Sequence, residues 1–186
     1  MGRLGRATRV AAVIGGAAAL VLAVRPKDPQ FELLSINLTG FRLRFEPPSL
    51  VPLLDIGLVL TVHATNPNVV GVRYSRSTMA IFYRGSLLGE AHVCAGEQRR
   101  NACRILRLSG KLNCLEMAHQ LAALASDLAR REMELAAETR IKGSANLLGW
   151  PHRFHIDVHS RLKVDPLLLD IMEQENRSRL QLTLSS

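Results

Sequence analysis

Apolar and polar side chains alternate with a period of two through much of this chain. The alternation organises the stretch from Leu54 to Asn68, where one set of alternate positions is wholly apolar: Ile56, Leu58, Leu60, Val62 and Ala64. This period places the two sets on opposite faces of an extended strand, so that one face is buried in a core. Pro67 removes a backbone donor and keeps Asn66 out of the helical region, which predicts that the strand ends there.

Similar alternation predicts a strand before this one and a hairpin after it. The opening strand runs from Phe31 to Phe45. Its apolar phase slips near Leu34 and at Thr39-Gly40, which predicts bulges or a bend. Further on, Arg84-Gly85-Ser86 separates two short apolar segments and predicts a hairpin turn.

The cleanest alternation lies in the second half of the chain. Residues Met133 to Ala145 and Phe154 to Val164 alternate with charged residues, which predicts a long antiparallel pair whose opposite charges face each other across the strands. The polar stretch Glu173 to Arg177 is assigned to a loop, and Leu180, Leu182 and Leu184 to a closing strand.

One helix interrupts these strands. After Asn113, apolar residues recur at intervals of three and four, and Asn113 with Glu116 resembles a capping box. We expect a helix from about Cys114 to Arg131 that packs against the sheets through a stripe of small residues. The sequence therefore predicts an all-β fold in residues 26–186, an immunoglobulin- or fibronectin-like β-sandwich with one inserted α-helix.

Residues 1–25 predict a membrane anchor. Val10 to Val24 carry no charge and follow a basic, acid-free segment. As a helix these residues span about 22 Å, which is short of the hydrocarbon core of about 30 Å, but flanking arginines can reach the interface. We expect one transmembrane helix, with its N-terminus cytosolic and the domain extracellular or lumenal, in the plasma membrane or endomembranes. A signal peptide cleaved after Val21-Leu22-Ala23, which would leave a secreted protein, and an organelle transit peptide remain alternatives.

The net charge of +8 raises the possibility of nucleic-acid binding. Four arginines flank the apolar N-terminal segment, and without them 20 basic residues remain against 16 acidic ones. These cations mostly alternate with apolar residues along the predicted strands, as on a solvated sheet face, and no nucleic-acid-binding motif is present. We therefore expect no nucleic-acid partner.

Several motifs together resemble a known family. They are the strand end Asn66-Pro67-Asn68, Tyr74, and the turn segment Tyr83-Arg84-Gly85-Ser86-Leu87-Leu88-Gly89. With the basic-apolar N-terminus, the chain from about 31 to 165 resembles the late embryogenesis abundant type-2 domain of the harpin-induced-like plant proteins. The resemblance implies a sandwich on a single membrane anchor and a role in stress or defence responses. Asn66, Pro67, Asn68, Tyr83, Gly85 and Gly89 are then structural motif residues.

Candidate sites are few. Cys94 and Cys103 flank a polar loop and are either a disulfide or free thiols. Asn37 and Asn176 begin glycosylation sequons, and we prefer Asn176 because we assign it to a loop. His155, Asp157 and His159 lie on one face of a predicted strand, and their spacing is compatible with metal binding. The simpler interpretation is that this face is exposed to solvent.

No arrangement of residues predicts an enzyme. The sequence contains neither a Gly-x-Ser-x-Gly elbow nor a glycine-rich phosphate loop, so we assign no catalytic residue, cofactor or metal. We expect a membrane-anchored, non-enzymatic protein of stress or defence that acts by binding or protection. The alternative is a lipid-binding or lipid-transfer module at the membrane surface. The partners are the membrane, through Val10 to Val24, and an unidentified protein or lipid.

Overall fold

The computed structural model describes residues 25–46, 51–113, 121–147 and 150–183. In this part of the chain ten strands and one helix occur. They are β1 (Gln30–Glu46), β2 (Val51–Asn66), β3 (Val72–Tyr74), β4 (Ser77–Tyr83), β5 (Ser86–Val93), β6 (Gly96–Gln98), β7 (Ala102–Asn113), α2 (Leu121–Arg130), β8 (Met133–Leu147), β9 (Trp150–Asp165) and β10 (Asp170–Thr183).

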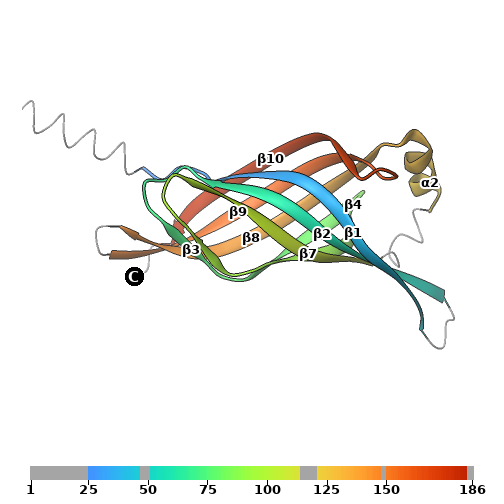
Figure 1. Ribbon diagram of the computed structural model, residues 1–186, viewed down its shortest axis with the longest axis horizontal. Helices are drawn as coiled ribbons and strands as arrows, with labels where there is room; N and C mark the ends of the chain where they lie inside the picture. Colours follow the sequence, from blue (N-terminus) through green and yellow to red (C-terminus); the bar gives the residue numbers. More distant parts are fainter. Residues whose placement is uncertain (1–24, 47–50, 114–120, 148–149, 184–186) are drawn as a thin grey trace, which may run out of the picture.

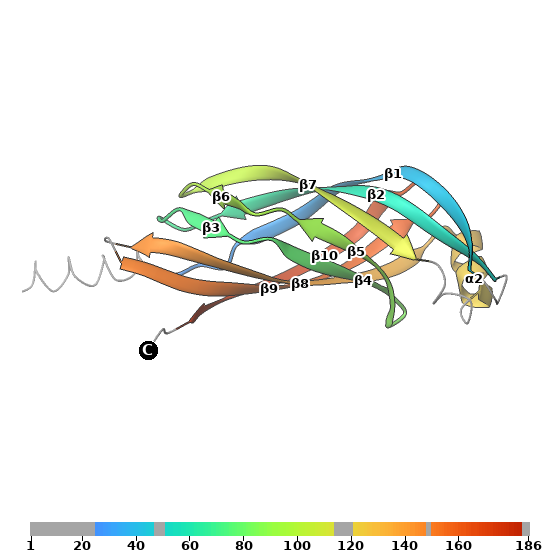
Figure 2. The same ribbon diagram turned by 90° about the horizontal axis from the view of Figure 1, so that it is seen from below.

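The strands form one antiparallel sheet. Its order is β1-β2-β7-β5-β4-β8-β9-β10, and the short strands β3 and β6 extend it beside the far end of β8. Figures 1 and 2 show the sheet twisted and curled along the length of the molecule. The curl brings β10 into contact with β1, although no backbone ladder joins these two strands in the described residues.

The all-β class with one inserted helix is confirmed, but the expected two-layer sandwich is wrong. One continuous sheet curls into a half-barrel, with β4 and β5 linking its two halves. The physical reason is strand length: β1, β2 and β9 have 17, 16 and 16 residues. Right-handed twist accumulates along such long strands, so the sheet curls instead of folding into two flat layers.

The predicted irregularities of the opening strand are present. The pairing of β1 with β2 shifts between Leu33 and Ser35 and again between Leu38 and Gly40. These shifts keep the apolar residues of β1 facing the apolar set of β2, with Leu33 opposite Val62 and Leu38 opposite Leu58. Each bulge also increases the local twist, which helps to curl the sheet.

The concave face of the sheet holds the hydrophobic core. The aliphatic residues predicted to point inward are buried there, among them Leu58, Leu60, Ile81, Leu108, Ile156 and Val164. The long antiparallel pair is confirmed as β8 and β9, with Glu134 opposite Lys163 and Arg140 opposite Asp157 on the outer face.

Two other predictions need correction. The helix packs Leu124 against the core and buries Asp127, whereas the small residues Ala122 and Ala125 are exposed. The buried carboxylate of Asp127 bonds to Tyr83 and Arg84, and these bonds set which face of the helix turns inward. The spacing of apolar residues alone could not reveal that face. Residues 114–120, where the predicted helix begins, lie outside the described residues.

The predicted polar loop at Glu173 to Arg177 is also wrong, because these residues belong to β10. Their inward side chains bond to the backbone of β1, as described below. The predicted anchor, Val10 to Val24, lies outside the described residues. In the described ranges, no helix has the length and apolar character needed to cross a bilayer.

Candidate functional site

An apolar cavity of about 140 Å³ lies inside the curled sheet. Strands from both halves of the sheet line it, with Leu60, Ile81, Leu108, Ala137 and Val158 among the residues that face it. An engineered cavity of about 150 Å³ in another protein, lined by similar side chains, stays dry and binds benzene. By that comparison, this cavity has room for an apolar group of about six carbons.

Strands β1 and β10 lie in contact along one side of this cavity. We call this contact the seam. Four hydrogen bonds between described residues cross the seam, and each joins a side chain to backbone. Gln174 Oε1 accepts from Leu33 N at 3.2 Å, and Asn176 Nδ2 donates to Phe31 O at 2.6 Å. Beyond them, Ser178 Oγ donates to Pro29 O, and Leu180 N donates to Asp28 Oδ1 at 2.7 Å.

Some of the residues that bridge the seam also line the cavity, namely Phe31, Leu33, Gln174 and Asn176. Asn176 has one further feature: its Oδ1 is buried and has no hydrogen-bond partner among the described residues. Away from the seam, the lining is apolar apart from the hydroxyl residues Thr139 and Ser160, and along the seam amide side chains meet it.

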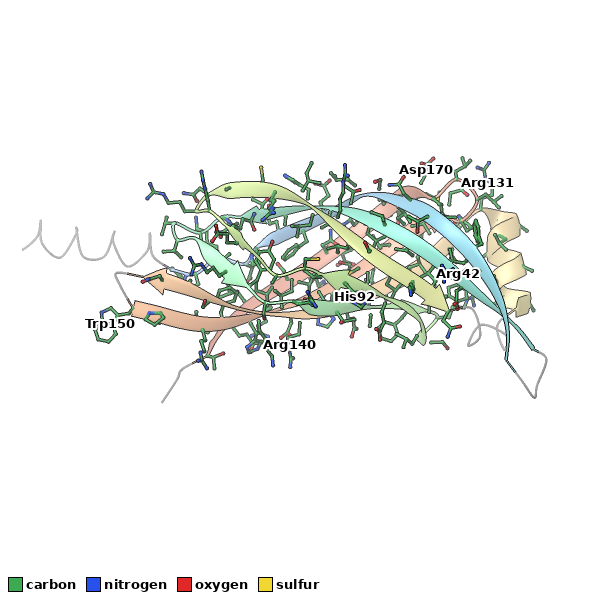
Figure 3. The ribbon with its side chains drawn as sticks, turned by 60° about the horizontal axis from the view of Figure 1, so that its bottom comes forward. Arg42, His92, Arg131, Arg140, Trp150 and Asp170 are labelled. Carbon is green, nitrogen blue, oxygen red and sulfur yellow. The ribbon has the colours of Figure 1, made fainter. Side chains whose placement is uncertain are left out.

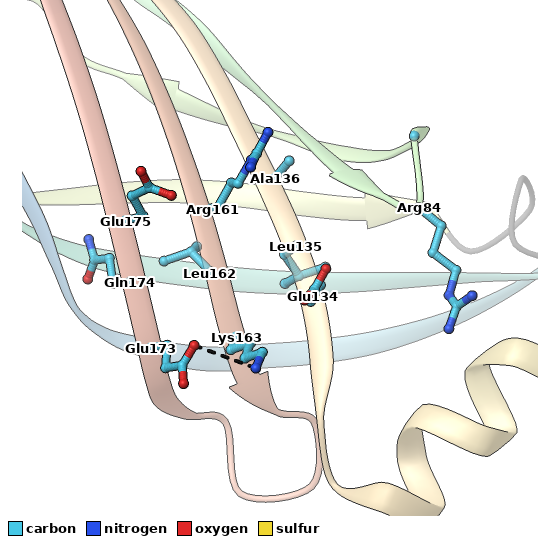
Figure 4. A pocket seen from close by; sticks show the side chains of 11 residues that line it. Arg84, Glu134, Leu135, Ala136, Arg161, Leu162, Lys163, Glu173, Gln174 and Glu175 are labelled. Carbon is cyan, nitrogen blue, oxygen red and sulfur yellow. Dashed lines mark ion pairs between the residues drawn. The ribbon is translucent and has the colours of Figure 1, made fainter.

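The outer face of β8, β9 and β10 carries a wider groove of about 690 Å³ (Figure 4). Its lining includes three acids, Glu134, Glu173 and Glu175, and three bases, Arg84, Arg161 and Lys163. Lys163 Nζ lies 3.0 Å from Glu132 and 3.5 Å from Glu173. Charges balanced and paired in this way are typical of a solvated sheet face, so we do not take the groove as the functional site.

A buried polar cluster fixes α2 beside the turn between β4 and β5. The Tyr83 hydroxyl donates to Asp127 Oδ2 at 2.8 Å, and Arg84 Nη2 reaches Asp127 Oδ1 at 3.0 Å. The pKa of the Asp127 carboxyl is held below its usual range by the Tyr83 hydrogen bond and by Arg84, although burial acts in the opposite direction. Burial and the hydrogen bond to Asp127 raise the pKa of Tyr83. All three groups are engaged with one another, so the cluster is structural.

The strand end Asn66-Pro67-Asn68 is a second buried polar cluster. Asn66 Nδ2 donates to Val70 O at 2.9 Å and Arg99 O at 3.1 Å, and its Oδ1 accepts from both nitrogens of Asn68. Asn68 in turn bonds both the N–H and the carbonyl of Lys27. The cluster therefore joins the end of β2 to the loop before β7 and to the segment that leads into β1.

The two glycines singled out in the sequence occupy special positions. Arg84 and Gly85 both have positive φ, 48° and 83°, and form a two-residue turn between paired Tyr83 and Ser86. Such primed turns match the twist of a hairpin and favour glycine. At Gly89, an added Cβ would lie 2.1 Å from Lys111 O, so the backbone of β7 leaves no space for a side chain.

The remaining sequence candidates are dispersed. Cys94 and Cys103 are exposed, free thiols in the structure. Asn37 is exposed on β1, and its Nδ2 donates to Ser35 Oγ at 3.0 Å. Asn176 lies in β10, not in a loop, and its amide is bonded across the seam. Sequon use at either asparagine stays a prediction.

The histidine face of β9 forms ion pairs instead of converging on a centre. Arg140 Nε lies 2.6 Å from Asp157 Oδ1 and lowers the pKa of that carboxyl, while His159 lies 3.4 Å from Glu138. Across the residues that the structure describes, no three His, Cys, Asp or Glu side chains are placed to hold a metal ion.

Comparison with known proteins decides the family. The model of the late embryogenesis abundant protein family, type 2, matches residues 61–164, which is more than half of the chain. The chain belongs to this family. Membership indicates a stress-related β protein, in agreement with the motifs at Asn66 and Tyr83. No curated protein sequence matches this late embryogenesis abundant protein.

Two solved structures are similar to it in part. One is a solution structure of a protein described as late embryogenesis abundant, with 12% identity, a TM-score of 0.37, and coverage of 97% of this chain and 87% of that one. The other is the crystal structure of a protein from Archaeoglobus fulgidus, with 11% identity, a TM-score of 0.35, and coverage of 83% and 100%. The family match begins within β2 and ends in β9, so the two strands of the seam lie outside it.

Proposed function

We propose that this late embryogenesis abundant protein is a non-enzymatic binding protein whose curled sheet takes the aliphatic part of a lipid. The observation that carries the proposal is the apolar cavity of about 140 Å³. Core interiors are normally packed to crystal density with few voids larger than a water molecule. A void of this size lined by aliphatic side chains loses contact energy unless an apolar group fills it.

A tether at the bilayer fits this activity. The predicted helix at Val10 to Val24 would hold the domain close to a large supply of lipid, with the domain on the extracellular or lumenal side. Protection of a C-terminal tag from added protease in sealed membranes supports this orientation, and digestion of the tag refutes it. A role in stress or defence would then come from binding or protecting membrane lipid.

Photo-crosslinking of the full chain tests the cavity. The protein is reconstituted in phosphatidylcholine vesicles that contain a fatty alcohol with a diazirine in its chain, and adducts are mapped by mass spectrometry after irradiation. We expect adducts at inward-facing residues such as Ala137 and Val158. Adducts confined to outward-facing positions would refute the proposal.

Two neighbouring alanines on β8 provide a matched pair of variants. Ala137 is buried and lines the cavity, whereas Ala136 faces the outer groove. Ala137→Leu places about three more carbons in the cavity and should reduce inward adducts several-fold. Ala136→Leu adds the same atoms outside and should leave the adducts unchanged. Equal effects of the two substitutions would count against binding inside the sheet.

A further inference from the structure

The polar atoms along the cavity wall restrict the chemistry of the ligand. Most of them already have partners. Gln174 Oε1 accepts from Leu33 N at 3.2 Å, and Thr139 Oγ1 donates to Thr78 O at 3.0 Å. The Glu32 side chain is 67% exposed and lies 4.0 Å from His63, so its charge points away from the cavity. Glu32 therefore places no charge inside the cavity.

Asn176 is different from these residues. Its Nδ2 is committed to Phe31 O at 2.6 Å, and this bond fixes which end of the amide is the oxygen. The Oδ1 atom is buried and without a partner among the described residues. A buried acceptor left unpaired keeps the full cost of its desolvation, so a donor supplied by a ligand would be preferred there.

From this atom we infer a ligand class: the cavity binds a neutral amphiphile with a short aliphatic segment and a hydroxyl, and that hydroxyl donates a hydrogen bond to Asn176 Oδ1. The inference rests on the proposed function and makes Asn176 a specificity-determining residue. A hydrocarbon or an ether has no donor for Oδ1. An ionised carboxylate has no donor either, and it would place a charge in an apolar site with no cation to pair it.

The test compares two isomers of equal volume, 1-hexanol and methyl pentyl ether, which differ in whether the oxygen carries a proton. Each is titrated into the full chain in nanodiscs, and binding is followed through the methyl NMR signals of Ile81 and Val158, which line the cavity. The quantity of interest is the ratio of the ether's dissociation constant to the alcohol's. Partition of each probe into lipid affects every variant alike, so it cancels when this ratio is compared between variants.

We expect Asn176→Leu to lower this ratio by at least about fivefold, since it removes the acceptor and keeps the volume. Ser178→Ala is the matched control, because Ser178 bridges the seam through Pro29 but is not part of the cavity lining. It should leave the ratio unchanged. If Asn176→Leu loses the dispersed methyl spectrum of a folded chain, Asn176→Ala replaces it with the same expected ratio.

The outcomes separate the two proposals. A ratio that is unaffected by Asn176→Leu, or lowered equally by Ser178→Ala, overturns the assignment of Asn176 and leaves apolar binding in place. If neither isomer shifts the methyl signals, then the cavity takes no ligand of this size, and the proposed function itself is refuted.

Discussion

At the scale of single residues, Asn66 shows how much a buried amide can connect. Only 2% of its surface is exposed, and four hydrogen bonds use both ends of its side chain. Its partners come from the loop after β2, from the segment before β7 and from Asn68. Pro67 ends the strand, but this amide holds the chain in place afterwards.

We therefore expect Asn66→Ala to lower the free energy of unfolding by at least about 2 kcal/mol, because it leaves several buried backbone groups without partners. Urea denaturation followed by circular dichroism measures the change. The matched control is Asn37→Ala, which removes an exposed amide and should change stability by less than about 0.5 kcal/mol. Equal midpoints for the two variants would contradict this account.

Glycine positions give a second prediction. Gly89→Ala would force Lys111 O away from a Cβ and should destabilise the protein by about 2 kcal/mol or more. At Gly40 no atom lies within 4 Å of the added carbon, so Gly40→Ala should be neutral or slightly stabilising. Thermal unfolding distinguishes them, and similar melting temperatures for both variants would show that β7 can move aside.

At the scale of elements, helix α2 is attached to the sheet by charge as much as by apolar packing. Asp127 is 8% exposed and is held by Tyr83 and Arg84, which belong to the end of β4 and its turn. The helical periodicity of the sequence could be recognised, but it selected a face containing Ala122 and Ala125. The buried face could not be deduced because its central residue is an aspartate, whose partners lie 43 and 44 positions earlier in the chain.

This attachment predicts a dependence on pH. The folded protein lowers the pKa of Asp127, so the stabilisation is complete above the unfolded value of about 4 and is lost as the pH falls through the lowered folded value. We expect wild type to be more stable than Asp127→Asn at pH 7 and the difference to shrink towards pH 2. Chemical denaturation at a series of pH values measures it, and a constant difference would exclude the carboxylate as the cause.

Whether the course of a strand could be predicted depended on whether its cause lies within the strand or in a distant part of the chain. The bulges of β1 were predictable because each one shifts the apolar phase within the strand itself. The inward residues of β10 include polar ones, and Gln174 and Asn176 lie in the stretch Glu173 to Arg177 that was predicted to be a loop. Only the approach of β1 from about 140 residues away gives these side chains partners. The cavity and the seam that bounds it could not be predicted either, because both depend on this distant contact between β1 and β10.

At the scale of the whole molecule, the long axis has two distinct ends. The described chain begins at the end where β8 and β9 meet, and Figure 3 shows Trp150 at this end, far from α2. Trp150 is 73% exposed and is the only tryptophan in the chain. Because tryptophan favours the membrane–water interface, a domain tethered through residues before Arg25 should place this end against the bilayer.

The fluorescence of Trp150 tests this arrangement. In vesicles containing brominated phosphatidylcholine, we expect the emission of the full chain to be quenched several-fold more than in unbrominated vesicles. The control is the double variant Trp150→Phe/Leu167→Trp, which moves the indole to an exposed turn between β9 and β10, near the α2 end. Quenching that is equal at both positions would contradict a fixed orientation.

The seam has a consequence for how copies of this protein behave beside one another. An unpaired strand edge exposes N–H and C=O groups that can recruit a strand from another molecule. Here Gln174 and Asn176 of β10 occupy Leu33 N and Phe31 O, two backbone groups near the start of β1 that a foreign strand would need. These bonds thereby limit the recruitment of a strand from a second copy along this part of β1.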